Sequence, residues 1–269
     1  MWQMPHLFVC VTIDLLLFVY YNTLVMKGKR YYYSGELSPN KIVNLEGEEF
    51  HHLSNVMRSR VGDEVILFNG DGNFYYSEIK SLNKKYAEIF VKNQIKSDNE
   101  PTICFDLYQA LAKGDKLSLI MQKITELGAN SLCLFESKFC DVKANTNKID
   151  RMDSIAISAA KQCGRATITK TEGIFSIKYV AQKIKDYDAF FVAYETSEDI
   201  TLADCLIKNN YNKIAVMIGA EGGFADDEIK LLQENGAKIV SLGKRILRTE
   251  TAAISCTALA TQILERKDK

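Results

Sequence analysis

Apolar and polar residues in the first third of the chain alternate in the short rhythm of β-strands. Residues 61–68, 74–79 and 86–91 form three largely apolar runs, separated by turns rich in Asn, Gly, Asp and Lys. Short strands at this spacing are typical of small antiparallel barrels. Apolar side chains at helical spacing predict a helix-like stretch over residues 50–57. We therefore expect a small β-barrel domain over residues 26–97.

A different rhythm follows the polar segment 98–101, which contains one of the three prolines and is the expected linker. Between residues 102 and 269, apolar runs of strand length alternate with stretches of helical periodicity. The expected strands are residues 103–110, 131–135, 189–194, 214–218 and 239–242, and the expected helices are residues 115–127, 151–163, 225–235 and 249–264. This alternation predicts an α/β domain with a mostly parallel sheet that helices cover on both faces.

The N-terminal 25 residues are almost continuously apolar from Leu7 to Val25, interrupted by Asp14. This length falls within the roughly 17–25 residues that can span a bilayer. However, Asp14 would lie near the middle of the membrane, and no basic region precedes the run. A buried element, a membrane anchor and an upstream extension before a start at Met26 all stay open. We favour the extension, and expect a membrane partner only if residues 1–25 are native and form an anchor.

The formal net charge is zero, from 34 basic and 34 acidic residues. Neutrality argues against a uniformly basic nucleic-acid-binding protein, so any RNA contact would use a local cationic patch. Seven cysteines are scattered without a C-x-x-C pair. This usage is typical of reduced cytosolic thiols, and we expect neither a disulfide framework nor a metal site.

Two glycine-containing loops carry the strongest signal for a ligand. One spans residues 219–223 and the other residues 242–248, and each follows an apolar strand-like run and precedes a helix-like one. In open parallel sheets, ligands bind at the carboxyl ends of the strands, where both loops are expected. Neither loop matches the dinucleotide pattern G-x-G-x-x-G or a P-loop. Thr249 also suits the N-cap of the last helix, although Arg245 and Arg248 are not explained by capping.

The ordered motifs of the chain resemble those of the RsmE family of bacterial methyltransferases, which belong to the SPOUT superfamily of trefoil-knotted enzymes. The matching segments are residues 51–53, 56–58, 61–64, 113–115, 122–128, 162–165, 219–224 and 242–252. The resemblance spans residues 26–264 and implies a PUA-like N-terminal barrel followed by a SPOUT α/β domain. It further implies that S-adenosylmethionine is the methyl donor and that N3 of a uridine in 16S ribosomal RNA is the target.

The resemblance also assigns roles to individual residues. It implies that the cofactor lies against Tyr194, Glu195, Ile218, Gly219, Ala220, Glu221, Gly222, Gly223, Leu242, Gly243, Arg245, Ile246, Leu247 and Thr249. Candidate catalytic residues are Arg248 and Arg165, which would stabilise developing negative charge, and Glu250, which would act as a base or orient an arginine. A simple helix-start role for Glu250 stays open.

Expected RNA contacts come from scattered cationic side chains, namely Arg58, Arg60, Lys113, Lys138 and Arg165. At Lys138 the family pattern tends to have arginine, and lysine keeps the charge without the bidentate geometry. The family pattern also has proline where this chain has Ala220. We expect a cytoplasmic homodimer that acts on the small ribosomal subunit. A SPOUT methyltransferase for another RNA, and a noncatalytic RNA-binding or ribosome-assembly protein, are the alternatives.

Overall fold

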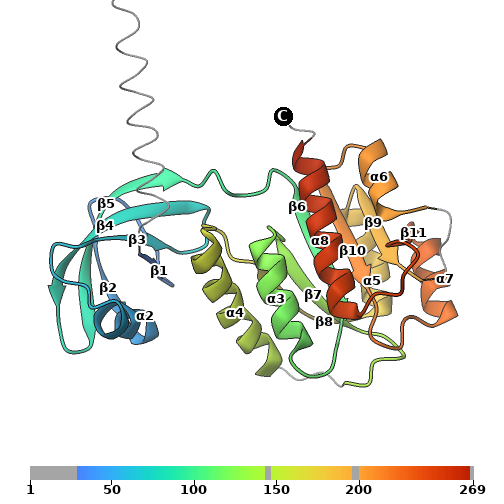
Figure 1. Ribbon diagram of the computed structural model, residues 1–269, viewed down its shortest axis with the longest axis horizontal. Helices are drawn as coiled ribbons and strands as arrows, with labels where there is room; N and C mark the ends of the chain where they lie inside the picture. The colour runs from blue at the N-terminus through green and yellow to red at the C-terminus, as the bar shows by residue number, and fades with distance from the viewer. Residues whose placement is uncertain (1–28, 143–146, 196–199, 267–269) are drawn as a thin grey trace, which may run out of the picture. The chain divides into compact units, whose positions relative to one another are not determined.

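The computed structural model describes residues 29–142, 147–195 and 200–266, so the expectations for residues 1–25 lie outside the described chain. The chain divides into two compact units, with the boundary between Ser97 and Asp98 (Figure 1). Within the described residues, no helix has the length and apolarity needed to cross a bilayer.

The first unit is a five-stranded sheet with a short helical segment. Its elements are β1 (Arg30–Tyr32), β2 (Ile42–Glu46), α2 (Gly47–His51), the π-helical turn η1 (His52–Val56), β3 (Glu64–Phe68), β4 (Asn73–Leu82) and β5 (Tyr86–Lys96). The strand order is β1-β3-β4-β5-β2, and only the β1–β3 pair is parallel. The helix-like stretch predicted over residues 50–57 is found as the end of α2 and η1, but its apolar face is not buried as a whole, because only Leu53 of η1 is buried.

Alternating burial along β5 shows how this unit forms its core. Ala87, Ile89 and Val91 are fully buried, whereas their neighbours along the strand retain exposure. Two register shifts interrupt the pairing of β4 with β5, and such bulges bend a sheet. The inner face of the bent sheet, which includes Tyr31 of β1, packs against Leu53 of η1.

The second unit has the predicted alternating order of strands and helices. Its elements are β6 (Cys104–Ala110), α3 (Lys116–Glu126), β7 (Ser131–Glu136), α4 (Asn147–Cys163), β8 (Lys170–Ser176), α5 (Ile177–Lys183), the 3-10 turn η2 (Ile184–Asp186), β9 (Ala189–Ala193), α6 (Leu202–Lys208), β10 (Lys213–Ile218), α7 (Asp226–Glu234), β11 (Lys238–Val240) and α8 (Thr249–Glu265). The six strands pair in parallel in the order β11-β9-β10-β6-β7-β8.

Helices cover both faces of this sheet, which confirms the predicted α/β layering (Figure 1). Phe105 and Leu107 of β6 point to the face that carries α3, α4, α6 and α8. Tyr108, the next residue along β6, packs on the opposite face with α5 and α7. Because successive side chains of a strand alternate between faces, a sheet buried on both sides needs continuous apolar runs.

The predicted linker 98–101 is partly built into the second unit. The backbone N–H of Ala166 and that of Thr167 each donate to Glu100 Oε1, at 2.7 and 3.0 Å. Pro101 lies so close to Gly128 that a Cβ there would approach its Cγ to 2.5 Å. Glu100 and Pro101 therefore anchor the start of the second unit rather than form a free connection.

Candidate active site

Three neighbouring parallel strands end at the same level in the second unit. In the register of the sheet, Ala193 at the end of β9 lies opposite both Ile218 of β10 and Val240 of β11. The chain segments that follow these strands therefore leave from one edge of the sheet. This carboxyl edge is where open α/β sheets bind ligands.

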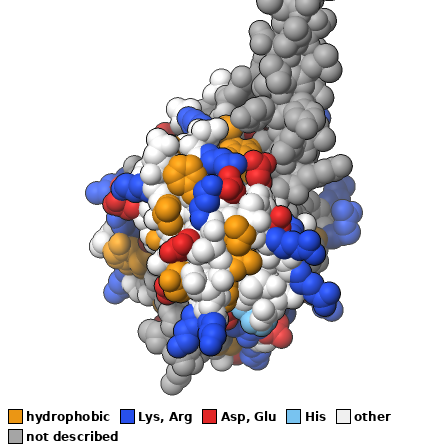
Figure 2. Space-filling view, turned by 90° about the vertical axis from the view of Figure 1, so that its left-hand side faces the viewer, with side chains coloured by type: hydrophobic (Ala, Val, Ile, Leu, Met, Phe, Trp, Pro, Cys, Tyr) orange, Lys and Arg blue, Asp and Glu red, His pale blue; other side chains and the backbone are white. Residues whose placement is uncertain are grey.

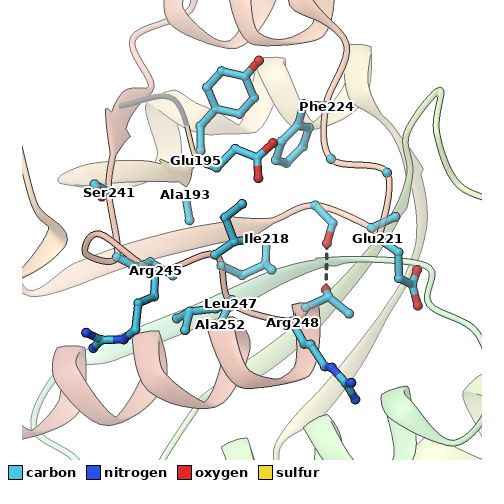
Figure 3. A pocket seen from close by; sticks show the side chains of 18 of the residues that line it. Ala193, Glu195, Ile218, Glu221, Phe224, Ser241, Arg245, Leu247, Arg248 and Ala252 are labelled. Atoms are coloured by element: carbon cyan, nitrogen blue, oxygen red, sulfur yellow. Dashed lines mark hydrogen bonds between the residues drawn. The ribbon is translucent and has the colours of Figure 1, made fainter. Parts of the chain in front are cut away.

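A cavity of about 550 Å³ lies at this edge (Figure 3). Every residue that the resemblance assigns to the cofactor lines it, as does Arg248. Six further residues line it: Phe224, Lys244 and Ala252, which lie within the matched motifs, and Lys116, Ala193 and Ser241, which the sequence did not single out. Most of these adjoin predicted positions, but Lys116 comes from α3, a distant part of the chain.

The loop after β10 forms a tight turn. The backbone N–H of Gly223 donates to the carbonyl of Ala220 at 3.0 Å, and Gly223 has φ +71°. Gly222 approaches the neighbouring loop so closely that a Cβ would lie 2.8 Å from Phe139 Cβ. Glycine at 222 is thus required by close approach, and at 223 by backbone conformation. Ala220 accepts this hydrogen bond through its carbonyl and is itself buried in the core of the unit.

The loop after β11 is held by Ser241. Its hydroxyl accepts a hydrogen bond from the backbone N–H of Gly243 at 3.1 Å, and Gly243 has φ +108°. Its backbone exchanges hydrogen bonds with Ile200 and Leu202, at 2.9 and 3.0 Å. These contacts turn the chain back across the cavity before α8 begins. At the tip, Ile246 is 82% exposed.

Thr249, at the start of α8, connects the glycine loop to β6. Its hydroxyl donates to the carbonyl of Gly219 at 2.7 Å, the hydrogen bond dashed in Figure 3, and accepts from Gln109 Nε2 at 2.9 Å. The predicted N-cap role is wrong, because Arg248 occupies the N-cap and Thr249 is the first residue of α8. The hydroxyl instead fixes the distance between the glycine loop and the last helix.

Lys116 and Glu221 line one side of the cavity, and Glu250, which is not among the lining residues, lies beside Lys116. Lys116 Nζ donates to Glu221 Oε1 at 2.6 Å and lies 3.8 Å from Glu250 Oε2. Burial acts to raise the pKa of Glu221, but the hydrogen bond from Lys116 and nearby backbone donors outweigh it and lower that pKa. In Figure 3, Arg245 and Arg248 extend from the second loop in different directions.

Arg165 does not take part in this site, which corrects both roles predicted for it. Its side chain does not line the cavity and is almost completely buried. Its guanidinium group donates to Glu100 Oε2 at 3.1 Å and to the carbonyls of Thr125 and Ala129 at 3.0 and 2.9 Å. A cation whose donors are engaged in this way stabilises the fold and has little left to offer RNA or a reacting base.

The remaining cationic residues predicted to contact RNA are exposed. Lys113 and Lys138 each pair with a carboxylate, Lys113 with Asp141 at 2.7 Å and Lys138 with Asp227. On the molecular face of Figure 2, Lys and Arg side chains are interspersed with acidic ones, as expected from zero net charge.

In the first unit, Arg58 and Arg60 are exposed on either side of buried Ser59. Lys29 Nζ donates to Ser59 Oγ at 3.1 Å and to the carbonyl of Met57 at 3.3 Å. Arg58 has φ +48°, a left-handed conformation that non-glycine residues rarely adopt. The hydrogen bond to Ser59 and the left-handed backbone at Arg58 accompany the exposure of the Arg58 and Arg60 side chains.

Comparison with known proteins identifies the family. The RNA methyltransferase domain model matches residues 99–261, and the RNA methyltransferase PUA domain model matches residues 45–92. Ribosomal RNA small subunit methyltransferase E of Bacillus subtilis is 33% identical over 82% of this chain and 91% of that protein. The protein of the same name from Buchnera aphidicola of Acyrthosiphon pisum is 30% identical over 90% of this chain and 97% of its own length.

Solved structures agree with these matches. The Neisseria gonorrhoeae ribosomal RNA small subunit methyltransferase E, bound to S-adenosyl methionine, has a TM-score of 0.80 and 30% identity over 88% of this chain and 98% of that chain. The putative methyltransferase Lpg2936 of Legionella pneumophila, also with bound cofactor, has a TM-score of 0.80 and 29% identity over the same shares. The chain described here therefore belongs to the ribosomal RNA small subunit methyltransferase E family.

Proposed function

We propose that this protein transfers a methyl group from S-adenosylmethionine to N3 of a uridine in 16S ribosomal RNA of the small subunit. The observation that carries the proposal is the cavity at the ends of β9, β10 and β11, lined by every residue assigned to the cofactor from the sequence. Family membership and the cofactor-bound relatives support the same donor.

The residues around the cavity fit this cofactor. A volume of about 550 Å³ lies within the range of small-molecule sites, roughly 300–1,000 Å³. Apolar side chains such as Ile218 and Leu247 suit the adenine ring, and the glycine loops offer backbone groups without an obstructing Cβ. The carboxylates of Glu195 and Glu221 suit the positive charges of the ligand. The bound cofactor would supply a methyl group activated by a sulfonium cation.

Two residues at the start of α8 are proposed to act on the target base. Methylation of uracil at N3 requires the loss of the N3 proton, and Glu250 is the proposed acceptor. Negative charge then spreads onto the carbonyl oxygens of the base, and the guanidinium of Arg248 is proposed to stabilise it. Arg248 lines the cavity and is exposed, which leaves its donors available to a substrate.

Each unit is proposed to contribute its own RNA contacts. Arg58 and Arg60 in the first unit, and Lys113 and Lys138 in the second, are proposed to contact phosphates, which position RNA without reading its sequence. For Lys113 and Lys138, RNA would compete with the paired aspartates.

A second copy of the chain is the proposed protein partner. The apolar side chain of Ile246 is 82% exposed at the edge of the cavity, and Leu259 of α8 and Leu119 of α3 are 37% and 41% exposed. Covering these side chains in a homodimer would remove them from water. Because the proposed substrate is a ribosomal subunit, we propose that the reaction takes place in the cytoplasm.

Ribosomal RNA from a strain that lacks the gene tests the proposed substrate. Methylation at N3 blocks base pairing, so reverse transcription of wild-type 16S RNA should stop at the modified uridine and should read through it in the deletion strain. Reintroducing the gene should restore the stop. An unchanged stop pattern in 16S RNA would reject this substrate, and a lost stop in another RNA would favour the alternative target.

A further inference from the structure

Lys116 is the one cationic side chain that α3 contributes to the cavity in the described chain. It is the first residue of α3 and is separated from Glu221 by 105 positions in the sequence. Its side chain is 31% exposed, so the ammonium group lies at the cavity wall and not free in solvent. Lys116 lies outside the two glycine loops, so the motifs of those loops did not predict a lysine in the cavity.

The ammonium group of Lys116 serves two carboxylates at once. Glu221 Oε1 accepts its hydrogen bond at 2.6 Å, and Glu250 Oε2 lies at 3.8 Å, within ion-pair distance. Two carboxylates this close to one another repel, and a cation between them offsets the repulsion. The contact also joins three elements, because the residues come from α3, the glycine loop and α8.

In this cluster of Lys116, Glu221 and Glu250, one carboxylate oxygen of Glu250 accepts no hydrogen bond from the described residues. Among the described residues, its Oε2 atom is buried and has no hydrogen-bond partner. Its position in the first turn of α8 offers free backbone N–H groups that usually attract a carboxylate. This oxygen lies instead on the Lys116 side. A buried acceptor without a donor is costly, which points to a donor that arrives with a ligand.

We propose that Lys116 is a positioning residue that holds Glu250 Oε2 ready to take the N3 proton of the target uracil. The inference rests on the proposed function and adds a residue to it. In this step the N3–H bond breaks and an O–H bond forms on Glu250. The electron pair left on N3 forms the new bond to the methyl carbon, and the electrons of the broken carbon–sulfur bond stay on sulfur. Lys116 keeps its proton throughout and remains paired with Glu221.

Variants of the full-length protein separate this role from cofactor binding and from folding. We would measure single-turnover methyl transfer to small subunits from a deletion strain, and calorimetric affinity for S-adenosylmethionine. Lys116→Met should slow transfer by about 100-fold, the scale of a lost proton-transfer contribution, and any change in the cofactor Kd should be far smaller than this loss of rate. Lys116→Arg should recover part of the rate, because arginine can still pair with both carboxylates.

Two comparisons make the test specific. Lys123→Met, on the same helix, removes a cation that pairs with Glu126, at 2.9 Å, and lies outside the cavity lining, so this variant should transfer at the wild-type rate. Glu250→Gln should slow transfer at least as much as Lys116→Met. Combining both changes should cause little further loss, because residues that act as one unit are not additive.

Three results would overturn the role of Lys116. They are a wild-type rate for Lys116→Met, a loss of cofactor or RNA affinity that accounts for the whole effect, and losses that multiply in the double variant. Cofactor binding without any transfer by the wild-type protein would contradict the proposed function itself, and the role of Lys116 with it.

Discussion

At the scale of single residues, Thr249 shows how a small side chain fixes the geometry of the cavity. It is almost completely buried, and its hydroxyl connects Gln109 of β6 to the carbonyl of Gly219. Sequence reasoning placed Thr249 at the cofactor and at the N-cap. A helix-start threonine looks the same in sequence whether its hydroxyl caps the helix or reaches another loop.

Replacing Thr249 with valine should therefore loosen the glycine loop from α8 and β6. The change keeps the shape but leaves Gly219 O without its donor and Gln109 Nε2 without this acceptor, which should cost about 1–3 kcal/mol of the free energy of unfolding. Affinity for S-adenosylmethionine should fall as well. Urea unfolding and calorimetry measure the two effects. Thr249→Ser, which keeps the hydroxyl, should behave like the wild type, and equal losses in both variants would contradict the hydrogen-bond account.

Lys116 and Arg165 mark the limits of residue-level prediction. Lys116 contacts Glu221 across 105 residues, a distance over which no local pattern carries information. Arg165 belongs to a motif of the family, but its environment of Glu100 and two carbonyls became visible only in the fold. A motif shows that a residue matters, and only packing shows whether it serves the site or the scaffold.

At the scale of elements, strongly periodic segments were predicted closely. The helix expected over residues 115–127 is α3 (Lys116–Glu126), and the one expected over 249–264 is α8 (Thr249–Glu265). The strand β8 (Lys170–Ser176) was missed, because it is an edge strand whose residues are all exposed or half-buried. Without a buried face, such a strand has no clear apolar alternation.

The contact between the glycine loop and the loop after β7 gives a second prediction. Gly222→Ala would place a Cβ 2.8 Å from Phe139 Cβ and 3.2 Å from the Phe139 carbonyl oxygen, so one loop must shift. We expect the affinity for S-adenosylmethionine to fall by at least about tenfold, as is usual when binding-site geometry is displaced. Calorimetry measures this directly.

Gly173→Ala is the matched control for that change. A Cβ at Gly173 would meet only ordinary contacts with Phe175, at 3.8 Å and beyond, and the residue lies in β8 away from the cavity lining. It should bind cofactor like the wild type. If Gly222→Ala also retained wild-type affinity, the close approach of the two loops would not matter for the site.

The buried ion pair of Glu100 with Arg165, at the start of the second unit, gives a prediction about stability in acid. Burial acts to raise the pKa of Glu100, but Thr167, Arg165 and backbone donors lower it overall. A depressed carboxyl pKa contributes stability above its unfolded value, about 4.3, and this contribution is lost as pH falls through the folded value. Glu100→Ala should thus lose about 3 kcal/mol of the free energy of unfolding at neutral pH and less in acid.

Urea titrations at neutral pH and at about pH 4 or below would measure how far the free energies of unfolding of the wild type and of Glu100→Ala approach one another in acid. Glu126→Ala removes the partner of Lys123 on the surface of α3 and should cost no more than about 1 kcal/mol. A gap between wild type and Glu100→Ala that stays constant with pH would show that the charge of Glu100 does not contribute.

At the scale of the whole molecule, the proposed homodimer can be measured by sedimentation. The exposed side chain of Ile246 and the exposed leucines of α3 and α8 predict a species of twice the chain mass at micromolar concentration. Leu259→Glu on α8 lies outside the cavity lining and should shift the population toward the single-chain mass, because it would bury an unpaired charge. A single-chain mass for the wild type would exclude the dimer.

The two-unit organisation and the parallel sheet were predictable because each has its own hydrophobic rhythm. For the site, the sequence predicted only the two loops that come directly after predicted strands. The side of the cavity formed by α3, and the anchoring of Glu100, depend on contacts between distant segments. The family resemblance supplied the proposed cofactor, and the sheet register shows that three strand ends meet at the cavity.

Methyl transfer by the purified protein tests the central claim most directly. Small ribosomal subunits from a strain that lacks the gene would be incubated with the protein and methyl-labelled S-adenosylmethionine, and the RNA digested to nucleosides. The account predicts label in 16S RNA, recovered as N3-methyluridine. Label in a different nucleoside or RNA, or cofactor binding without any transfer to the subunits, would contradict it.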